Sequence, residues 1–211
     1  MSAFDSRLEL IAAAEYFYKQ GWMVGTAGNL SARLPDGSFW ITASGKSKGN
    51  LNLTDFVKIT PDGAVEFPSN DLKPSAETAI HQTIYKLFPE AQACYHVHSI
   101  EANLVSRFVE GDTLLLPPLE MLKGFNIWQE NLNITLSIFP NHLDVSKIAI
   151  EIEDRFQIVP PQIPALLIRD HGVTVWADST EKARNFIELI EYIFRYIVAA
   201  SQTGVKINPY V

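Results

Sequence analysis

Apolar residues recur with helical spacing in the first part of the chain. In RLELIAAAEYFYKQG, residues 7–21, one helical face carries Leu8, Ile11, Ala12 and Tyr16. The segment from Ser2 to Asp5 can cap the start of a helix, and a glycine is suited to its end. The pattern predicts an amphipathic helix that packs on a core.

The spacing changes to short runs between residues 29 and 67. NLSARL, SFWIT, FVKIT and AVEF are separated by PDG, SGKSKGN and PDG, which are rich in turn-forming residues. Strands joined by tight turns have this pattern. We therefore predict a small antiparallel sheet in this part of the chain.

Helix and strand signals alternate over the next hundred residues. Helical spacing occurs in SAETAIHQTIYKLF, where Ser75 can accept a backbone hydrogen bond at the helix start, and again in IEANLVSRF and DVSKIAIEIEDRF. The strand candidates are ACYHVHS, LLLP and TLSIF. ALLIRDHGVTVWA is typical of a hairpin that turns at residues 170–172.

A long helix is predicted at residues 178–201. It begins with a capping box from Asp178 to Glu181, and its apolar stripe contains Phe186, Ile190, Ile193 and Ile197. Such a stripe suits the core or an interface between subunits. Helices at the start, middle and end, with strands between them, favour an α/β or α+β sandwich over a bundle or an all-β barrel.

Composition and charge restrict the classes of protein to consider. The 211 residues are enough for one substantial core, and we predict a single domain over residues 1–211. Hydrophobic residues make up 47% of the chain and the net charge is −7. The chain therefore lacks the basic surface of a nucleic-acid binder, and an anionic small molecule would need a local positive site.

The expected compartment follows from cysteine usage and from the first residues. Cys94 is the one cysteine, which excludes an intrachain disulfide, and MSAFDSRLELIAAAEYF lacks the features of a signal peptide. Charged residues interrupt every apolar run well before the roughly 20 residues needed to cross a bilayer. We expect a cytoplasmic protein with neither a membrane nor a nucleic acid as partner.

Two histidines one residue apart are the first candidates for chemistry. Side chains i and i+2 share a face of a strand, so His96 and His98 of HVH point the same way. Neutral imidazole is the commonest metal ligand, and a catalytic zinc usually takes three protein ligands. The alternative for an isolated HxH is two partly buried histidines hydrogen-bonded to the backbone.

A third histidine would complete such a site. His171 lies at the tip of the predicted hairpin, where Gly172 can adopt an unusual backbone angle. His81 on a helix and His142 in a loop are better explained as solvated or capping groups. Spacing alone leaves the choice among the three open.

Two glycine-containing loops are candidates for binding an anion. GTAGNLSAR, residues 25–33, and TASGKSKGN, residues 42–50, combine backbone amides with hydroxyls and lysines such as Lys46. Ser75, just before a predicted helix, adds a third possible contact. Neither loop fits GxxxxGK[ST] or GxGxxG, so ATP and nicotinamide cofactors are not indicated. Ordinary sheet turns remain the alternative for each loop.

Taken in order, GTAGNLSAR, TASGKSKG, KPSAETAIH, YHVHS and RDHGV resemble the class II aldolase/adducin family over nearly the whole chain. The resemblance implies an α/β fold, a three-layer α/β/α sandwich with a central, largely antiparallel sheet. It also implies one Zn²⁺ per subunit, held by His96, His98 and His171. The implied phosphate contacts of a sugar-phosphate substrate are Gly28, Asn29, Ser44, Gly45 and Ser75. Ala76 stands where the family has a second serine, so one hydroxyl contact is missing.

Within the family, PLEMLKGF most resembles a segment of the branch whose members remove water from a methylthio-substituted ketose 1-phosphate in methionine salvage. This resemblance implies a zinc-dependent dehydratase with Glu120 as its acid/base residue, although Leu119 replaces the glutamine often found before that glutamate. Glu77 matches the base of the sugar-phosphate aldolases. An aldolase or epimerase with the same zinc site and a non-enzymatic adducin-like module are the alternatives. A homotetramer is implied as well.

Overall fold

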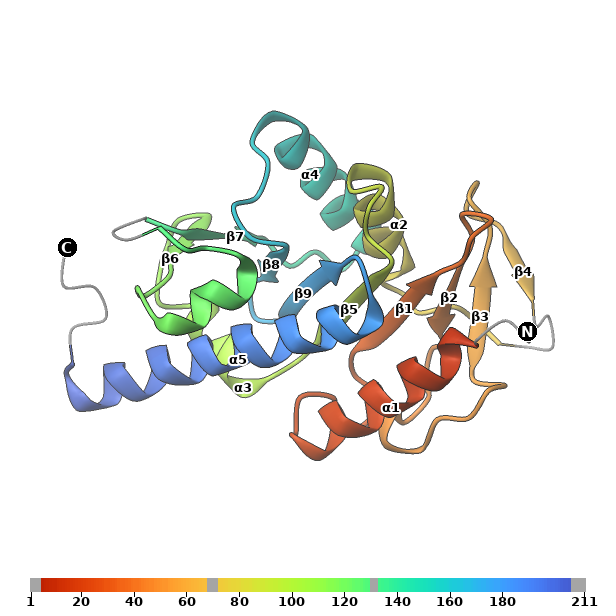
Figure 1. Cartoon of the computed structure of the whole chain (residues 1–211), viewed down its shortest axis with the longest axis horizontal. Coiled ribbons are helices and arrows are strands. Elements are labelled where there is room, and N and C mark those ends of the chain that lie inside the picture. The colour runs from red at the N-terminus through yellow and green to blue at the C-terminus, as the bar shows by residue number, and fades with distance from the viewer. Residues whose placement is uncertain (1–4, 68–71, 130–132, 206–211) are drawn as a thin grey trace.

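The computed structural model describes residues 5–67, 72–129 and 133–205 (Figure 1). In these ranges nine strands form one sheet, in the order β4-β3-β2-β1-β5-β9-β8-β7-β6. The strands are β1 (Asn29–Arg33), β2 (Phe39–Thr42), β3 (Phe56–Ile59), β4 (Val65–Phe67), β5 (Ala93–Val97), β6 (Thr113–Leu115), β7 (Thr135–Phe139), β8 (Ala165–Ile168) and β9 (Gly172–Ala177).

The sheet is largely antiparallel, as predicted. β7 and β8 pair in parallel, whereas the other neighbouring strands, such as β1 with β2 and β5 with β9, are antiparallel. The short runs between residues 29 and 67 become β1 to β4, which form one end of the large sheet rather than a separate one. Strand β5 contains His96 and ends just before His98. It lies in the middle of the sheet between β1 and β9.

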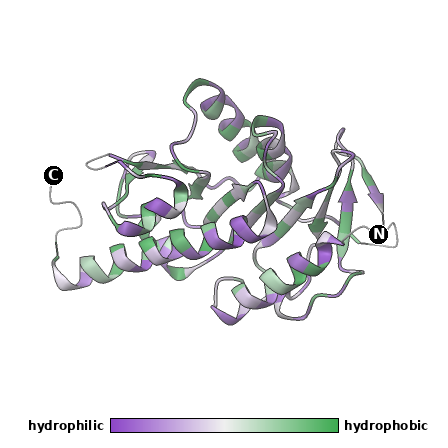
Figure 2. Ribbon diagram, in the orientation of Figure 1, coloured by the Kyte–Doolittle hydropathy of each residue, from purple (hydrophilic) through white to green (hydrophobic). Residues whose placement is uncertain are grey.

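Helices cover both faces of the sheet, so the predicted three-layer sandwich is confirmed (Figure 1). One face packs against α1, α3, α5 and the short helix η2, and the other against α2 and α4. The helices are α1 (Ser6–Lys19), η1 (Lys48–Asn50), α2 (Thr78–Leu87), α3 (Ile100–Ser106), η2 (Glu120–Phe125), α4 (Val145–Ile158) and α5 (Thr180–Thr203). Figure 2 shows hydrophobic positions along α5 and along the strands that it covers.

The apolar stripe of α5 is buried in this core, as the helical spacing indicates. Phe186, Ile190, Ile193 and Ile197 all lie within the larger hydrophobic cluster. Despite its length, α5 is not a membrane span: within the described ranges no helix is both long and apolar enough to cross a bilayer. The prediction of a single domain over residues 1–211 stays a prediction.

Helix capping differs from the sequence prediction at α5 and agrees with it at α2. At α5 the capping residue is Ser179, whose side chain accepts from the backbone N–H of Lys182, and not the predicted Asp178. At α2 the helix begins after Glu77, and Ser75 accepts from the backbone N–H of Glu77, which is the backbone hydrogen bond predicted at this helix start. Asp5 caps α1, while positions 2–4 of the predicted cap lie outside the described residues.

The hairpin between β8 and β9 turns where the sequence predicts, but Gly172 plays a different part. The left-handed backbone angle belongs to Asp170, with φ of 54°. A Cβ on Gly172 would lie 2.2 Å from the carbonyl oxygen of Val97. Gly172 is therefore required for the close approach of β9 to the end of β5, and the expectation of an unusual φ there was wrong.

We expect Gly172→Ala to destabilise the protein. The added methyl must displace backbone rather than a flexible side chain, and such overpacking typically costs about 1–3 kcal/mol in the free energy of unfolding. Chemical denaturation measures the change. Gly111→Ala is the matched control, because nothing lies within 4 Å of a Cβ there and its loss is expected to be negligible. Equal stability of the two variants would contradict this account of the hairpin.

Candidate metal centre and adjoining anion cavity

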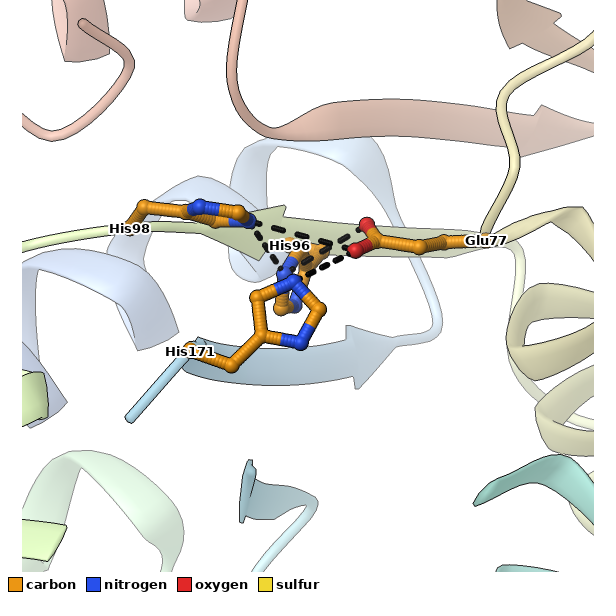
Figure 3. A group of neighbouring side chains, drawn as sticks. All are labelled: Glu77, His96, His98 and His171. Carbon is orange, nitrogen blue, oxygen red and sulfur yellow. Dashed lines mark hydrogen bonds and ion pairs between the residues drawn. The ribbon is translucent and has the colours of Figure 1, made fainter. Parts of the chain in front are cut away.

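Four side chains from separate segments converge beside the middle of the sheet (Figure 3). His96 comes from β5, His98 from the residue after that strand, His171 from the β8–β9 turn, and Glu77 from the start of α2. One donor atom of each lies within 4.8 Å of the donor atoms of the other three. We call these four residues the His-Glu cluster.

The Nε2 atoms of the histidines point toward one another and toward the carboxylate of Glu77 (Figure 3). His171 Nε2 lies 2.6 Å from Glu77 Oε1, and His96 Nε2 lies 3.4 Å from Glu77 Oε2. His96 Nε2 and His98 Nε2 are 2.8 Å apart. The three rings are close to perpendicular in pairs, at 80°, 76° and 90°, so each presents a lone pair from a different direction.

Burial favours neutral imidazoles at His96 and His98 beside the Glu77 carboxylate. Burial lowers the pKa of His96 well below its ordinary value, and it lowers the pKa of His98 to about 4, even though the charge of Glu77 acts in the opposite direction. Burial alone would raise the pKa of Glu77, but the neighbouring imidazoles hold it below its ordinary value. Near neutral pH His96 and His98 therefore offer nitrogen lone pairs, and Glu77 offers one negative charge.

This donor set fits a divalent transition metal. Neutral imidazole and carboxylate are the protonation states in which both side chains bind metals, and three histidines with one carboxylate match known zinc chemistry. Hydrogen bonds between the side chains can satisfy only some of these lone pairs, whereas one cation would satisfy all four donors. His96 Nδ1 lies 2.8 Å from Thr174 Oγ1, a contact that can orient the ring from behind.

The structure brings His171 to the HVH pair and places the other two histidines elsewhere. His142 is hydrogen-bonded to Glu151, with Nε2 2.8 Å from Oε1, away from the cluster. His81 is fully buried and hydrogen-bonded to Asn29 and Ser31, so the expectation of a solvated or capping group was wrong for it. The assignment of His96, His98 and His171 as ligands stays a prediction, now with a geometry that suits it.

A small cavity of about 170 Å³ lies beside the cluster, and Glu77 and His98 belong to the walls of both. We call it the anion cavity. A water molecule takes up about 30 Å³, so the cavity is large enough for an anion the size of phosphate. Of the predicted phosphate contacts, those that line the cavity are Gly28, Asn29, Ser44, Gly45 and Ser75. Gly28 has φ of 74°, and a Cβ there would lie 2.8 Å from the carbonyl oxygen of His96.

The cation in this cavity is Lys48, which the sequence reasoning did not select. Lys46, the predicted contact, instead pairs with Asp55 at 2.8 Å and does not line the cavity. Lys48 is buried, and its Nζ donates to the carbonyl oxygens of Thr26 at 2.8 Å and of Lys46 at 2.9 Å. An ammonium has three N–H donors, so one remains for a ligand. Burial lowers the pKa of Lys48 to about 8, against the pull of the Glu77 charge.

The two candidate acid/base carboxylates lie in different surroundings. Glu77 belongs to the cluster and lines the cavity. Glu120 begins η2, its side chain is 79% exposed, and it pairs with Lys123 at 2.8 Å rather than with any member of the cluster. From the sequence, Glu77 is a candidate base only through the resemblance to the aldolases, because its contacts with the histidines join segments about twenty residues or more apart.

The sequence is similar to a known family and to named proteins. Residues 8–198 match the family described as Class II Aldolase and Adducin N-terminal domain. The chain is 64% identical over 199 residues to a methylthioribulose-1-phosphate dehydratase of Microcystis aeruginosa, covering 94% of this chain and 97% of that protein. It is 43% identical over 205 residues to the enzyme of the same name from Leptospira biflexa, covering 92% of this chain and 97% of that protein.

Solved structures show the same fold. YgbL from Escherichia coli is 25% identical and superposes with a TM-score of 0.78, covering 92% of this chain and 88% of YgbL. L-fuculose-1-phosphate aldolase from Thermus thermophilus, at 20% identity, superposes with a TM-score of 0.75, covering 93% of this chain and 94% of the aldolase. Sequence and fold together place this chain in the class II aldolase and adducin family.

Proposed function

We propose that the protein is a methylthioribulose-1-phosphate dehydratase, which converts 5-methylthioribulose 1-phosphate to 2,3-diketo-5-methylthiopentyl 1-phosphate and water. The observation that carries the proposal is the shared wall between the His-Glu cluster and the anion cavity. A compact sugar phosphate can reach both at once, with its phosphate in the cavity and its carbonyl at the histidines. The names of relatives up to 64% identical support the choice of substrate.

In this proposal the anion cavity binds the phosphate group of the substrate. Ser44 and Ser75 can donate hydroxyl hydrogen bonds, Asn29 lies at the boundary with the cluster, and Lys48 provides a buried positive charge. Hydrogen bonds between charged partners are stronger than neutral ones, so Lys48 should contribute most per contact. The cavity thereby supplies the local positive site that a chain with a net charge of −7 needs for an anionic substrate.

Dehydration requires loss of a proton from C3 and of hydroxide from C4 of the ketose. Glu77 is the carboxylate that this chain places at the site, and its ionised form can accept the C3 proton. The same group, once protonated, can return a proton to the departing C4 hydroxyl, and the resulting enol then ketonises. A divalent ion held by His96, His98 and His171, which we propose to be Zn²⁺, would stabilise negative charge on the substrate oxygens as a Lewis acid.

Glu120 can act as the acid/base residue only if a second copy of the chain places it at the site. Its exposed position on η2 and its absence from the cavity wall leave it no part in the site of its own chain. A symmetric homo-oligomer, which we propose to be a tetramer, would bring the η2 surface of one subunit toward a neighbour. Comparison of Glu77 and Glu120 variants therefore distinguishes the two arrangements.

Replacing Lys48 by methionine should raise KM for the phosphorylated substrate far more than it lowers kcat. Loss of a hydrogen bond to a charged group costs about 1.5–3 kcal/mol, which corresponds to roughly a 10- to 100-fold weaker affinity. Steady-state kinetics and competitive inhibition by inorganic phosphate measure the loss. Lys46→Met is the comparator, because its ammonium pairs with Asp55. A larger rise of KM in Lys46→Met than in Lys48→Met would contradict the assignment.

The direct test of the proposed function is to incubate the zinc-loaded protein with 5-methylthioribulose 1-phosphate and identify the product. The proposal expects the diketone with no small aldehyde released, and loss of turnover after treatment with a chelator. Formation of an aldehyde or of dihydroxyacetone phosphate would instead assign an aldolase. Recovery of an epimeric sugar phosphate would assign an epimerase.

A further inference from the structure

Behind the His-Glu cluster, a chain of buried polar side chains links α2 to β1. Glu77, His81 and Tyr85 are spaced four residues apart along α2, and Asn29 and Ser31 are two apart on β1. Four helical residues advance about 6 Å and two strand residues about 6.6 Å, so the two rows can interleave. The resulting order of contacts is Glu77, Asn29, His81, Ser31, Tyr85.

Each contact in this chain is a hydrogen bond between buried atoms. Asn29 Nδ2 donates to Glu77 Oε2, and Asn29 Oδ1 lies 2.5 Å from His81 Nε2. His81 Nδ1 lies 2.6 Å from Ser31 Oγ, which lies 2.8 Å from Tyr85 OH. All five residues are buried, and the cavity and the cluster touch only the Glu77 and Asn29 end.

The chemistry of the groups fixes the direction of every bond. An ionised carboxylate only accepts, so the amide nitrogen of Asn29 must face Glu77 and its oxygen must face His81. The amide oxygen also only accepts, so His81 must carry a proton on Nε2. A neutral ring then has a bare Nδ1, which accepts from the hydroxyl of Ser31, and Ser31 accepts from Tyr85.

Two further features agree with this direction. Burial lowers the pKa of His81 to about 4 despite the nearby charge of Glu77, which keeps the ring neutral. Ser31 Oγ lies 3.3 Å from the carbonyl oxygen of Cys94, farther than from His81 Nδ1, so the hydroxyl of Ser31 is better placed to donate to the imidazole nitrogen than to the carbonyl.

We propose that His81 is a positioning residue, which holds the Asn29 amide in one orientation and through it fixes the Glu77 carboxylate. With Oε2 held by Asn29, Oε1 is left facing His171 Nε2, at 2.6 Å. Without the His81 donor, the Asn29 amide oxygen has no partner and the amide no longer has a fixed position, so its hydrogen bond to Oε2 weakens and Glu77 is held less firmly in the cluster. The expected effect on kcat rests on the proposed function. The expected orientation of the Asn29 amide and the Glu77 carboxylate does not.

The location of the His81 proton tests the proposal in the unaltered protein. Nitrogen-15 spectra of histidine-labelled protein distinguish a ring protonated at Nε2 from one protonated at Nδ1, and the signal missing from His81→Gln assigns the residue. We expect a proton on Nε2 and none on Nδ1. A neutral ring with its proton on Nδ1 would overturn the proposal, because Nε2 could not then donate to Asn29.

Two substitutions at the same position separate positioning from packing. Glutamine can place a donor near the position of Nε2, whereas leucine fills space without one. Loss of a residue that orients a site typically costs about 10- to 100-fold in activity or metal affinity. We expect His81→Leu to lose that much in kcat and in affinity for Zn²⁺, with His81→Gln within about threefold of the unaltered protein. If leucine retained as much as glutamine, the side chain would serve packing alone and the proposal would fail.

Controls keep this result separate from the proposed function. Lys86→Met, on the exposed side of α2 where Lys86 pairs with Glu153, should leave kcat and metal affinity unchanged. If the unaltered protein did not dehydrate 5-methylthioribulose 1-phosphate, the proposed function would fail, while the His81 proton and the Zn²⁺ affinities would still decide this proposal. If His81→Leu did not fold, the position of the His81 proton and the behaviour of His81→Gln would still test the proposal.

Discussion

Replacing His98 by alanine should abolish metal binding and lower the dehydration rate by about 10³- to 10⁴-fold, because a metal acting as a Lewis acid contributes several kcal/mol to the transition state. His98 is the cluster histidine that also lines the anion cavity, so its loss opens the site without removing a core side chain. Metal content after dialysis and turnover at saturating substrate measure the two effects. Both should fall together.

His142→Ala is the matched control for that experiment. His142 is a histidine outside the cluster, lies just before α4, and is hydrogen-bonded to Glu151 of that helix. Its alanine variant should bind metal and turn over substrate as the unaltered protein does. If His98→Ala kept a full complement of tightly bound metal, His98 would not be a ligand, and the three-histidine assignment would be wrong.

Replacing Glu77 by glutamine should lower kcat by about 10²- to 10⁴-fold, the usual cost of losing a general acid/base group. Glutamine keeps the shape of the side chain but cannot take a proton. Because Glu77 also lies within the His-Glu cluster, the substitution should weaken metal binding too. Kinetics at increasing zinc separates these effects: a rate loss caused by metal release recovers with excess metal, whereas loss of the base does not.

Glu120→Gln provides the comparison. Within one chain Glu120 is exposed and paired with Lys123, so its substitution should cost far less than that of Glu77. If the rate of Glu77→Gln recovered fully with excess metal while Glu120→Gln stayed inactive, the acid/base group would be Glu120 from a neighbouring subunit. Co-assembly of Glu120→Gln with His98→Ala would then restore roughly a quarter of the sites, since each site would combine two subunits.

The three candidate histidine ligands could be predicted in part from the sequence because their signal is partly local. Alternation along a strand places His96 and His98 on one face without any knowledge of the fold. His171 needed the resemblance to the family, because spacing could not choose among three histidines. The structure supplies the reason for its position: β9 pairs directly with β5, which brings the β8–β9 turn beside the end of the HVH strand.

The errors concern side chains whose direction depends on distant segments. His81 lies on a helix face that a local pattern cannot tell from a solvated one, and its partners Asn29 and Ser31 are about fifty residues earlier. Lys46 and Lys48 carry the same charge and lie in one short loop. The pairing of Lys46 with Asp55, and the turn η1 that begins at Lys48, decide which ammonium faces the cavity.

Anomalous diffraction from crystals grown with zinc tests the central claim most directly. The account predicts one strong peak per chain, about 2.0–2.1 Å from the Nε2 atoms of three histidines, as expected of zinc bound to imidazole. Those histidines are His96, His98 and His171. A peak absent from this position at saturating zinc, or one held by other side chains while these three imidazoles hydrogen-bond only to one another, would contradict it.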